Sequence, residues 1–229
     1  MKRDEANVRF RRLRAIIKSI TMTGLLFAMA CPTAGVADAQ LDARVEKFLE
    51  QRRGTWRDLN VPYEDGKILH DLIVERKFTR ALEIGTSTGH STIWIAWALS
   101  KTGGKLTTVE IDPARHEQAK ANVTAAGLSQ HVEFILGDAH KIVPAARGRY
   151  DFVFSDADKD WYIHYFDAMY PKLTHNACFT AHNVEESRFG LTRGWVRRYL
   201  EHVRGLPDMQ TSIHPNSRAG VAITCKKTA

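Results

Sequence analysis

The sequence predicts an α/β fold built on a doubly wound, mostly parallel sheet of seven strands that ends in an antiparallel hairpin. Three observations support this prediction. From residue 81 onward, short apolar runs rich in β-branched and aromatic residues alternate with helical patterns. Strands that alternate with helices form parallel sheets covered on both faces. The last two strand-like runs have no helix between them, which is typical of an antiparallel pair at a sheet edge.

Each element follows from its own pattern. Apolar residues at helical spacing predict two helices before the first strand, around residues 41–49 and 68–73. Strands are predicted at residues 81–84, 105–111, 132–136, 150–156, 177–182, 209–214 and 220–226. Helices are predicted between them at residues 91–99, 113–126, 139–145, 161–170 and 194–203. This is the pattern of a Rossmann-like sheet, in which ligands bind at the carboxyl ends of the strands.

The first 39 residues differ from the rest. Seven Lys or Arg residues precede an uncharged stretch over residues 20–37, and Ala37-Asp38-Ala39 has small residues at the spacing that a signal peptidase reads. We expect residues 1–39 to be a signal peptide or leader that exports residues 40–229, a single domain, to the periplasm or beyond. A cytoplasmic protein is the alternative. Thr, Gly and Pro interrupt the uncharged stretch, so no stable membrane span is expected.

Charge and cysteine content limit the function further. The leader has seven basic and three acidic residues, so the formal net charge of +7 falls by 4, to +3, for residues 40–229. This modest charge, without a basic and aromatic stripe, argues against a nucleic-acid partner. Cys178 and Cys225 lie in predicted strands without metal-binding spacing, so we expect small core residues. A disulfide between them is the alternative if the protein is exported.

Two predicted strand ends have residues that suit a nucleoside ligand. LEIGTSTGHST (residues 82–92) places Gly85 and Gly89 at a strand-to-helix turn, where glycine lets the backbone approach a ligand. Glu110 ends the second strand, where a carboxylate can accept both ribose hydroxyls. Asp112 is expected only to cap the following helix.

The third strand adds Asp138 and Ala139, which are placed to line an adenine pocket. Taken singly, these features also have plain explanations as a turn and helix caps. Together they predict a site for S-adenosylmethionine (SAM).

The fourth strand ends in the most specific motif, DFVFSDADKDWY at residues 151–162. With ALEIGTSTGHST, VEID, GDA, HNV and the final hairpin, the chain resembles the class I SAM-dependent methyltransferases. Within these it is similar to the metal-dependent catechol and caffeoyl-CoA O-methyltransferases, from about Asn60 to Lys227. The function that this resemblance implies is methyl transfer from SAM to a hydroxyl group of a small, aromatic substrate, assisted by a divalent cation.

The resemblance also implies roles for single residues. Around the methionine part of SAM it places Val61, Glu83, Gly85, Ser87 and Ser91. Glu110 would hold the ribose, and Asp138 and Ala139 would border the adenine. Asp156 would line the SAM site and bind the cation, together with His182-Asn183 after the fifth strand. Lys159 would be the general base, because a nearby cation makes both the hydroxyl and the lysine more acidic; a surface lysine paired with an aspartate is the alternative.

The sequence departs from the family at two places. His182 stands where an aspartate is usual, which removes a negative charge and shifts preference from magnesium toward manganese or zinc. Three consequences of this replacement remain open: the site binds a different metal ion, it binds the ion more weakly, or it binds none. The last hairpin lacks the glutamate of the catechol enzymes but has Arg218, so an anionic substrate is conceivable.

Further expectations concern substrate and partners. Trp161, Tyr162 and Phe189 are candidates for an aromatic slot, with core packing as the alternative. A homodimer through residues 41–59 is expected from the resemblance alone. The second functional hypothesis is an exported binding protein without catalysis on the same fold, because SAM is made in the cytoplasm and His182 alters the metal site.

Overall fold

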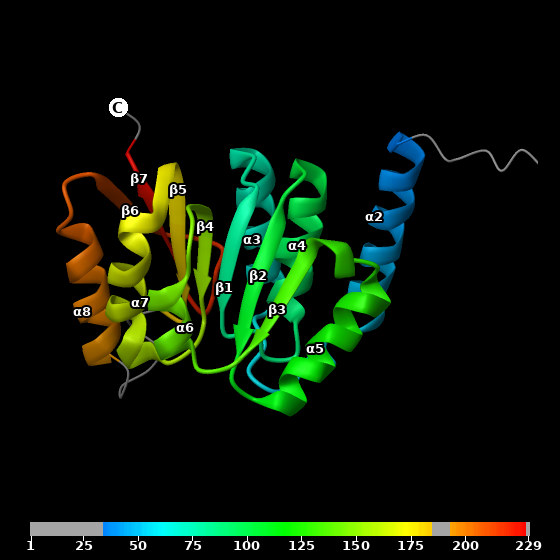
Figure 1. Cartoon of the computed structure of the whole chain (residues 1–229), viewed down its shortest axis with the longest axis horizontal. Coiled ribbons are helices and arrows are strands. Elements are labelled where there is room, and N and C mark those ends of the chain that lie inside the picture. The colour runs from blue at the N-terminus through cyan, green and yellow to red at the C-terminus, as the bar shows by residue number, and fades with distance from the viewer. Residues whose placement is uncertain (1–33, 185–192, 228–229) are drawn as a thin grey trace, which may run out of the picture. The chain divides into compact units, whose positions relative to one another are not determined.

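The computed structural model of the chain describes residues 34–184 and 193–227 (Figure 1). The helices are α2 (Ala34–Gln51), α3 (Tyr63–Arg76), α4 (His90–Thr102), α5 (Pro113–Ala126), α6 (Ala139–Ala145), α7 (Tyr162–Met169) and α8 (Arg193–Arg204). Short 3-10 turns are η1 (Ser129–His131), η2 (Lys159–Trp161) and η3 (Tyr170–Lys172). The strands are β1 (Arg80–Ile84), β2 (Lys105–Glu110), β3 (Val132–Leu136), β4 (Tyr150–Ser155), β5 (Leu173–His182), β6 (Met209–Ile213) and β7 (Val221–Lys226).

The strands form one sheet in the order β3-β2-β1-β4-β5-β7-β6. The pairs among β1 to β5 are parallel, whereas β7 is antiparallel to both β5 and β6. The predicted doubly wound sheet with a C-terminal antiparallel hairpin is therefore confirmed. Because the strands are parallel, the carboxyl ends of β1 to β5 meet at one edge of the sheet.

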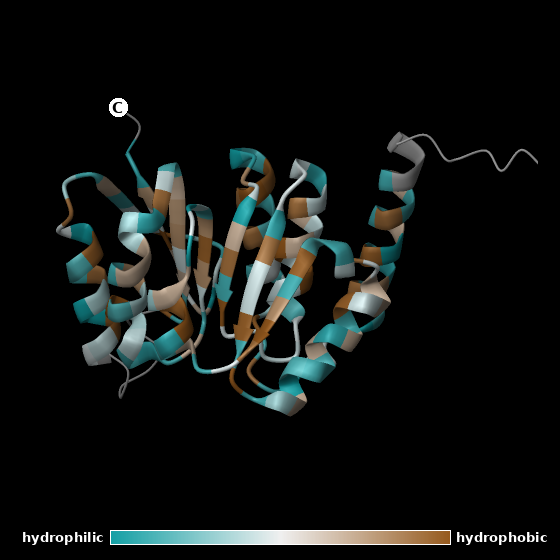
Figure 2. Ribbon diagram, in the orientation of Figure 1, coloured by the Kyte–Doolittle hydropathy of each residue, from teal (hydrophilic) through white to brown (hydrophobic). Residues whose placement is uncertain are grey.

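Both faces of the sheet are buried, and successive side chains of a strand point to opposite faces. Ala81 and Phe152 pack toward α3 and α4, while Leu82 and Val153 pack toward α6, α7 and α8. Burial on both sides explains the nearly continuous apolar runs of the central strands. Figure 2 shows the corresponding mixed colouring of the helices, with hydrophobic and hydrophilic residues interspersed along each one.

The described residues, 34–184 and 193–227, belong to one unit by their contacts. Residues 1–33 of the predicted leader lie outside the described residues, and its residues 34–39 belong to α2. Of the helices that the structure describes, none combines the length and apolar character that crossing a membrane requires. The export prediction stays a prediction.

The fifth strand begins at Leu173, earlier than the expected residue 177. The pairing of β4 with β5 is irregular between Tyr150 and Phe152, and Asn176 has a positive φ of 65°. This irregularity falls on the polar residues 174–176, which interrupt the apolar pattern. A strand with such a distortion lacks the regular alternation of apolar and polar residues by which a strand is recognised in the sequence.

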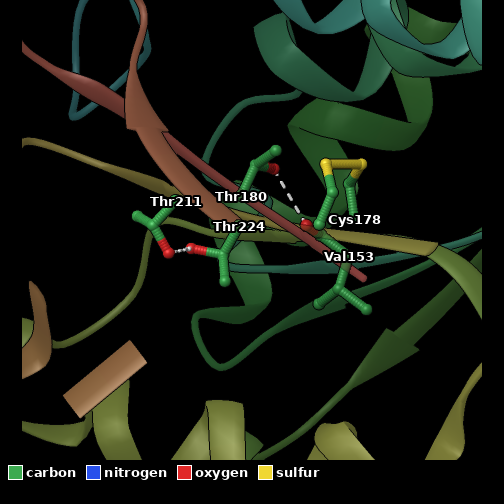
Figure 3. The surroundings of a disulfide bond; sticks show 6 residues. Val153, Cys178, Thr180, Thr211 and Thr224 are labelled. Atoms are coloured by element: carbon green, nitrogen blue, oxygen red, sulfur yellow. Dashed lines mark hydrogen bonds between the residues drawn. A yellow bond between two sulfur atoms is a disulfide. The ribbon is translucent and has the colours of Figure 1, made fainter. Parts of the chain in front are cut away.

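Cys178 and Cys225 form a disulfide, so the expectation of two reduced core cysteines is wrong. The two residues are directly opposite each other on β5 and β7, with Cα atoms 4.0 Å apart (Figure 3). Hydrogen bonds that involve three threonines surround the bond. Thr180 donates to the carbonyl of Val153, and the hydroxyls of Thr211 and Thr224 lie 3.1 Å apart. The structure therefore supports the alternative prediction, a disulfide between these two cysteines.

Candidate active site

A cavity of about 660 Å³ opens at the carboxyl ends of the parallel strands. This is a usual size for a small-molecule site. The predicted site residues in its lining are Gly85, Ser87, Glu110, Asp138, Ala139, Asp156, Lys159, His182 and Asn183. Segments that follow β1, β2, β3, β4 and β5 all contribute to this one cavity, as the sequence predicts for a Rossmann-like sheet.

Gly85 forms part of the cavity floor, where the ends of β1 and β4 touch. Its φ is +94°, and a Cβ atom there would lie 2.9 Å from the carbonyl oxygen of Asp156. Only glycine adopts this conformation and this close approach without strain. The floor is therefore bare backbone, which leaves room for a ligand.

Glu110 is fixed at the end of β2 by backbone donors. Its Oε2 accepts from the amide of Ser87 at 2.7 Å, and its Oε1 accepts from the amides of Ile111 and Asp112. Two backbone amides therefore occupy Oε1, whereas Oε2 can accept one further hydrogen bond, so Glu110 can bind a ribose hydroxyl in the cavity. Asp112 accepts from the amides of Ala114 and Arg115 and caps α5, as expected.

Glu83, Ser91 and Val61 lie beneath the cavity lining rather than in it. Glu83 is completely buried and accepts hydrogen bonds of 2.6 Å from the hydroxyls of Ser91, Thr92 and Thr108. Burial raises its pKa to about 7, although these hydroxyls favour the charged form. The carbonyl of Val61 is 2.8 Å from Nδ1 of His90. These residues hold the turn after β1 in place under the cavity.

Four ionisable side chains are connected in a row, from Lys159 in the cavity lining to Asp65, which lies outside the lining. Lys159 Nζ donates to Oδ1 of Asp156 at 2.7 Å, and Nδ1 of His182 lies 3.1 Å from Oδ2 of Asp156. Nε2 of His182 lies 2.9 Å from Oδ2 of Asp65, which α3 provides. The side chain of Asp65 is 1% exposed and that of His182 is 4% exposed. The order Lys159, Asp156, His182, Asp65 alternates in sign, and we call it the charge chain.

The charge chain changes how readily its members bind protons. Burial alone would lower the pKa of His182, but the charges and hydrogen bonds of Asp156 and Asp65 outweigh it and raise the pKa to about 9. Burial alone would raise the pKa of Asp156, but the positive charges of His182 and Lys159 outweigh it and lower the pKa. At neutral pH the histidine is therefore a cation and the aspartate an anion.

These contacts do not fit the predicted metal site. Both oxygens of Asp156 accept from cationic groups of the chain, and both ring nitrogens of His182 face carboxylates. A nitrogen that donates to a carboxylate has no lone pair for a metal ion. Within residues 34–184 and 193–227, moreover, no group of three or more His, Cys, Asp or Glu side chains is arranged to hold one. The donor atoms of Asp156 and His182 are bonded to each other, to Lys159 and to Asp65 instead.

The candidate substrate residues lie outside the cavity lining. Tyr162 is 1% exposed, and its hydroxyl donates to the carbonyl of His182. Trp161 stacks on His140 with ring centroids 3.7 Å apart. Arg218 is exposed in the turn between β6 and β7, where the adjacent Ala219 lines the cavity. Phe189 lies outside the described residues.

Sequence reasoning missed part of the cavity wall. His140 and Tyr165 both line the cavity, and both bond to the same oxygen of Asp158 at 2.8 Å. Asp158 therefore organises an aromatic wall beside Ala139. Only proximity in space reveals this role, because the three residues come from α6, α7 and the loop after β4.

Sequence reasoning also missed Asp65, although a signal was present. Asp65 precedes Ile68 and Leu69 by three and four positions and so lies on the apolar face of the predicted helix. A carboxylate on such a face needs a buried partner, which sequence analysis can ask for but not identify.

Comparisons with known proteins agree with this geometry. A family model described as O-methyltransferase matches residues 36–184. A catechol O-methyltransferase of Niastella koreensis is 39% identical over 112 residues, which are 47% of this chain and 50% of that protein. The alignments to the first curated relatives thus span about half of their length.

Two solved structures are similar over most of the chain. Cofactor-bound Rv0187 from MTB has a TM-score of 0.68 and 25% identity, covering 88% of this chain and 94% of that one. The O-methyltransferase TomG from Streptomyces achromogenes, involved in tomaymycin synthesis and solved in complex with SAM, has a TM-score of 0.66 and 26% identity. That match covers 84% of this chain and 96% of that one.

Proposed function

The chain belongs to the O-methyltransferase family whose model matches residues 36–184, and from this premise we propose that it transfers a methyl group from SAM to a hydroxyl group of a small aromatic substrate. One observation carries the proposal. Glu110, which suits a ribose, and the Lys159–Asp156 pair, which suits a reacting hydroxyl, line the same cavity of about 660 Å³. A residue suited to the cofactor and a pair suited to the acceptor hydroxyl therefore share one cavity.

The residues divide into a cofactor half and an acceptor half. Gly85 and Ser87 suit the amino-acid end of SAM, Glu110 its ribose, and Asp138 with Ala139 its adenine. Asp156, Lys159 and Asn183 are left for the acceptor. The wall of His140 and Tyr165 lies beside Ala139 and suits the planar adenine, while an aromatic acceptor is supported by the similarity to a catechol O-methyltransferase.

The chemistry needs a base and a positioned oxygen. Bound SAM supplies an electrophilic methyl group, which passes to the acceptor oxygen as the carbon–sulfur bond breaks and its electron pair stays on sulfur. Lys159 is placed to take the hydroxyl proton, and for this step it must be a neutral amine. Asp156 holds the Nζ atom at 2.7 Å and so fixes where that proton goes.

The first prediction tests the base. Lys159→Ala should lower kcat by about 10²–10⁴-fold on a catechol-like phenol, because a general base contributes about this much. SAM affinity, measured by calorimetry, should change far less. Lys120→Ala is the control, since Lys120 lies on the exposed side of α5 and pairs with Glu117. Undiminished turnover of the Lys159 variant would remove this assignment, and no SAM binding at millimolar ligand would remove the whole proposal.

A second candidate function is a binding protein on the same fold without catalysis. Its motivation is His182, which stands at the expected metal position and is already bonded on both ring nitrogens. SAM binding without methyl transfer to any of a broad panel of phenols, with metal ions varied, would favour it.

We also propose that the chain works in an oxidising compartment. The basic and uncharged pattern of residues 1–39 supports export, and the disulfide between β5 and β7 supports an oxidising environment. Intact-mass analysis of protein from its native cells tests both points together. Retention of residues 1–39 with two free thiols at Cys178 and Cys225 would contradict the proposal.

A further inference from the structure

We propose that this site holds no divalent cation, because the ring nitrogens of His182 and the carboxylate oxygens of Asp156 that would bind one are already bonded to Asp65, to Lys159 and to each other. The inference deepens the proposed function and rests on it for its catalytic meaning. Its structural content, that the site does not bind a metal ion, can be tested without any methyl transfer.

The first step of the argument is the burial of Asp65. This carboxylate lies on α3 with its side chain 1% exposed, and its Oδ1 has no hydrogen-bond partner. Its Oδ2 bonds to His182. A buried carboxylate is costly without an opposite charge, so Asp65 favours a histidine that is positively charged.

The second step is the occupancy of the imidazole ring. A carboxylate only accepts hydrogen bonds, so a ring between two carboxylates donates from both nitrogens. His182 is in this position, with Asp156 at 3.1 Å and Asp65 at 2.9 Å. A metal ion would have to displace the hydrogen on Nδ1 and compete with Lys159 for Asp156.

The third step is the count of charges. By formal charge, two aspartates (Asp65 and Asp156) and two basic side chains (His182 and Lys159) sum to zero in the resting site, before Lys159 loses the proton that its role as a base requires. Aspartate in place of His182 would give three negative charges and one positive charge, a net of two negative charges. That net charge is what a divalent cation neutralises. His182 thus removes the electrostatic reason for binding one.

A consequence for the substrate follows. A metal ion that chelates the acceptor favours two adjacent hydroxyl groups, whereas a hydroxyl positioned by hydrogen bonds needs no neighbour. Lys159 and Asn183 both line the cavity, and each has an N–H group that can donate to an acceptor oxygen. Phenols with one hydroxyl group are therefore expected as acceptors alongside catechols.

The test compares metal binding in three proteins by the electron paramagnetic resonance of free Mn²⁺. Wild-type protein should leave the Mn²⁺ signal unchanged, and His182→Asp should bind Mn²⁺ at least about tenfold more tightly, because it restores the net negative charge. His175→Asp is the matched control, since His175 is an exposed residue of the same strand, and it should behave as wild type. Methyl transfer by the wild type should also survive dialysis against a chelator.

Two results would overturn the inference. One is stoichiometric binding of Mn²⁺ or Zn²⁺ by the wild type that is lost in His182→Asn. The other is methyl transfer that a chelator abolishes and added metal restores. If His182→Asp does not fold, the wild-type binding measurement still decides. If no phenol is methylated under any condition, the proposed function fails, while the Mn²⁺ comparison still tests this inference separately.

Discussion

His90, the first residue of α4, is buried with both ring nitrogens in use. Nδ1 donates to the carbonyl of Val61, and Nε2 accepts from the indole N–H of Trp94 at 3.1 Å. Because an indole only donates, Nε2 must be without a proton. The ring of Trp56 stacks on the imidazole with centroids 4.5 Å apart. This site accepts neutral histidine only, and burial lowers its pKa to about 4.

His90 therefore predicts a loss of stability in acid. Its pKa falls from 6.5 in the unfolded chain to about 4 in the folded one. The stabilisation is complete above pH 6.5 and is lost as the pH falls toward 4, because only the unfolded state then binds a proton. The full effect is on the order of 3 kcal/mol. Urea unfolding at pH 7.5 and pH 5 would measure about 2 kcal/mol of this effect, because pH 5 lies above the folded pKa. His90→Gln should flatten this dependence, His175→Gln should not, and parallel curves for wild type and His90→Gln would contradict the assignment.

At the same scale, the sequence predicted some residues of the site and not others. Asp156 and Lys159 follow β4 and His182 ends β5, so their place at the sheet edge can be derived from chain order alone. Asp65 is 117 positions from His182, and Cys178 is 47 positions from Cys225. Such contacts depend on how helices and strands pack, which local patterns do not encode.

At the scale of elements, α3 and α4 pack through a glycine. A Cβ atom on Gly66 would lie 2.1 Å from Cδ1 of Trp94. Trp94 is buried, and its indole N–H is bonded to His90, so it has little freedom to move. Gly66 therefore sets how closely the two helices approach.

Gly66→Ala should destabilise the protein by about 1–3 kcal/mol through overpacking, although alanine is the better helix former. Gly194→Ala is the control within α8, where the added Cβ would have no atom nearer than Arg198 at 4.0 Å. It should be neutral or stabilising by up to about 1 kcal/mol. Urea unfolding of both variants would measure the difference. Equal stability of the Gly66→Ala and Gly194→Ala variants would show that the Trp94 side chain moves to accommodate the added methyl group.

Element boundaries were predictable where the chain carries strong local signals. Helix α5 begins and ends at the expected residues, because Asp112 caps it, Pro113 starts it and Gly127 ends it. The expected helix at residues 161–170 is instead divided into η2, α7 and η3. Its apolar pattern continues through these turns, so the pattern alone does not reveal where the helix geometry changes.

At the scale of the whole molecule, the disulfide joins the C-terminal hairpin to the central sheet. It closes a loop with a sequence separation of 47 residues. A loop of this length is expected to stabilise the folded state by roughly 3–4 kcal/mol, mainly by restricting the unfolded chain. This is a large part of the stability of an ordinary domain.

A reducing agent should therefore lower the free energy of unfolding by roughly 3–4 kcal/mol. The Cys178→Ala, Cys225→Ala double variant should lose a similar amount and then be insensitive to dithiothreitol. Chemical unfolding with and without the reductant would measure both effects. A wild-type protein with the same midpoint under both conditions would show that the bond contributes nothing.

The place of β7 in the sheet has a consequence for the order of events during synthesis. This strand is made after every other strand that the structure describes, yet it lies between β5 and β6. Until residues 221–226 have left the ribosome, β5 has an unpaired edge and β6 has no neighbour. The sheet therefore stays incomplete until β7 is available, and until then the nascent polypeptide can be bound by chaperones and by a translocation channel that threads unfolded chains.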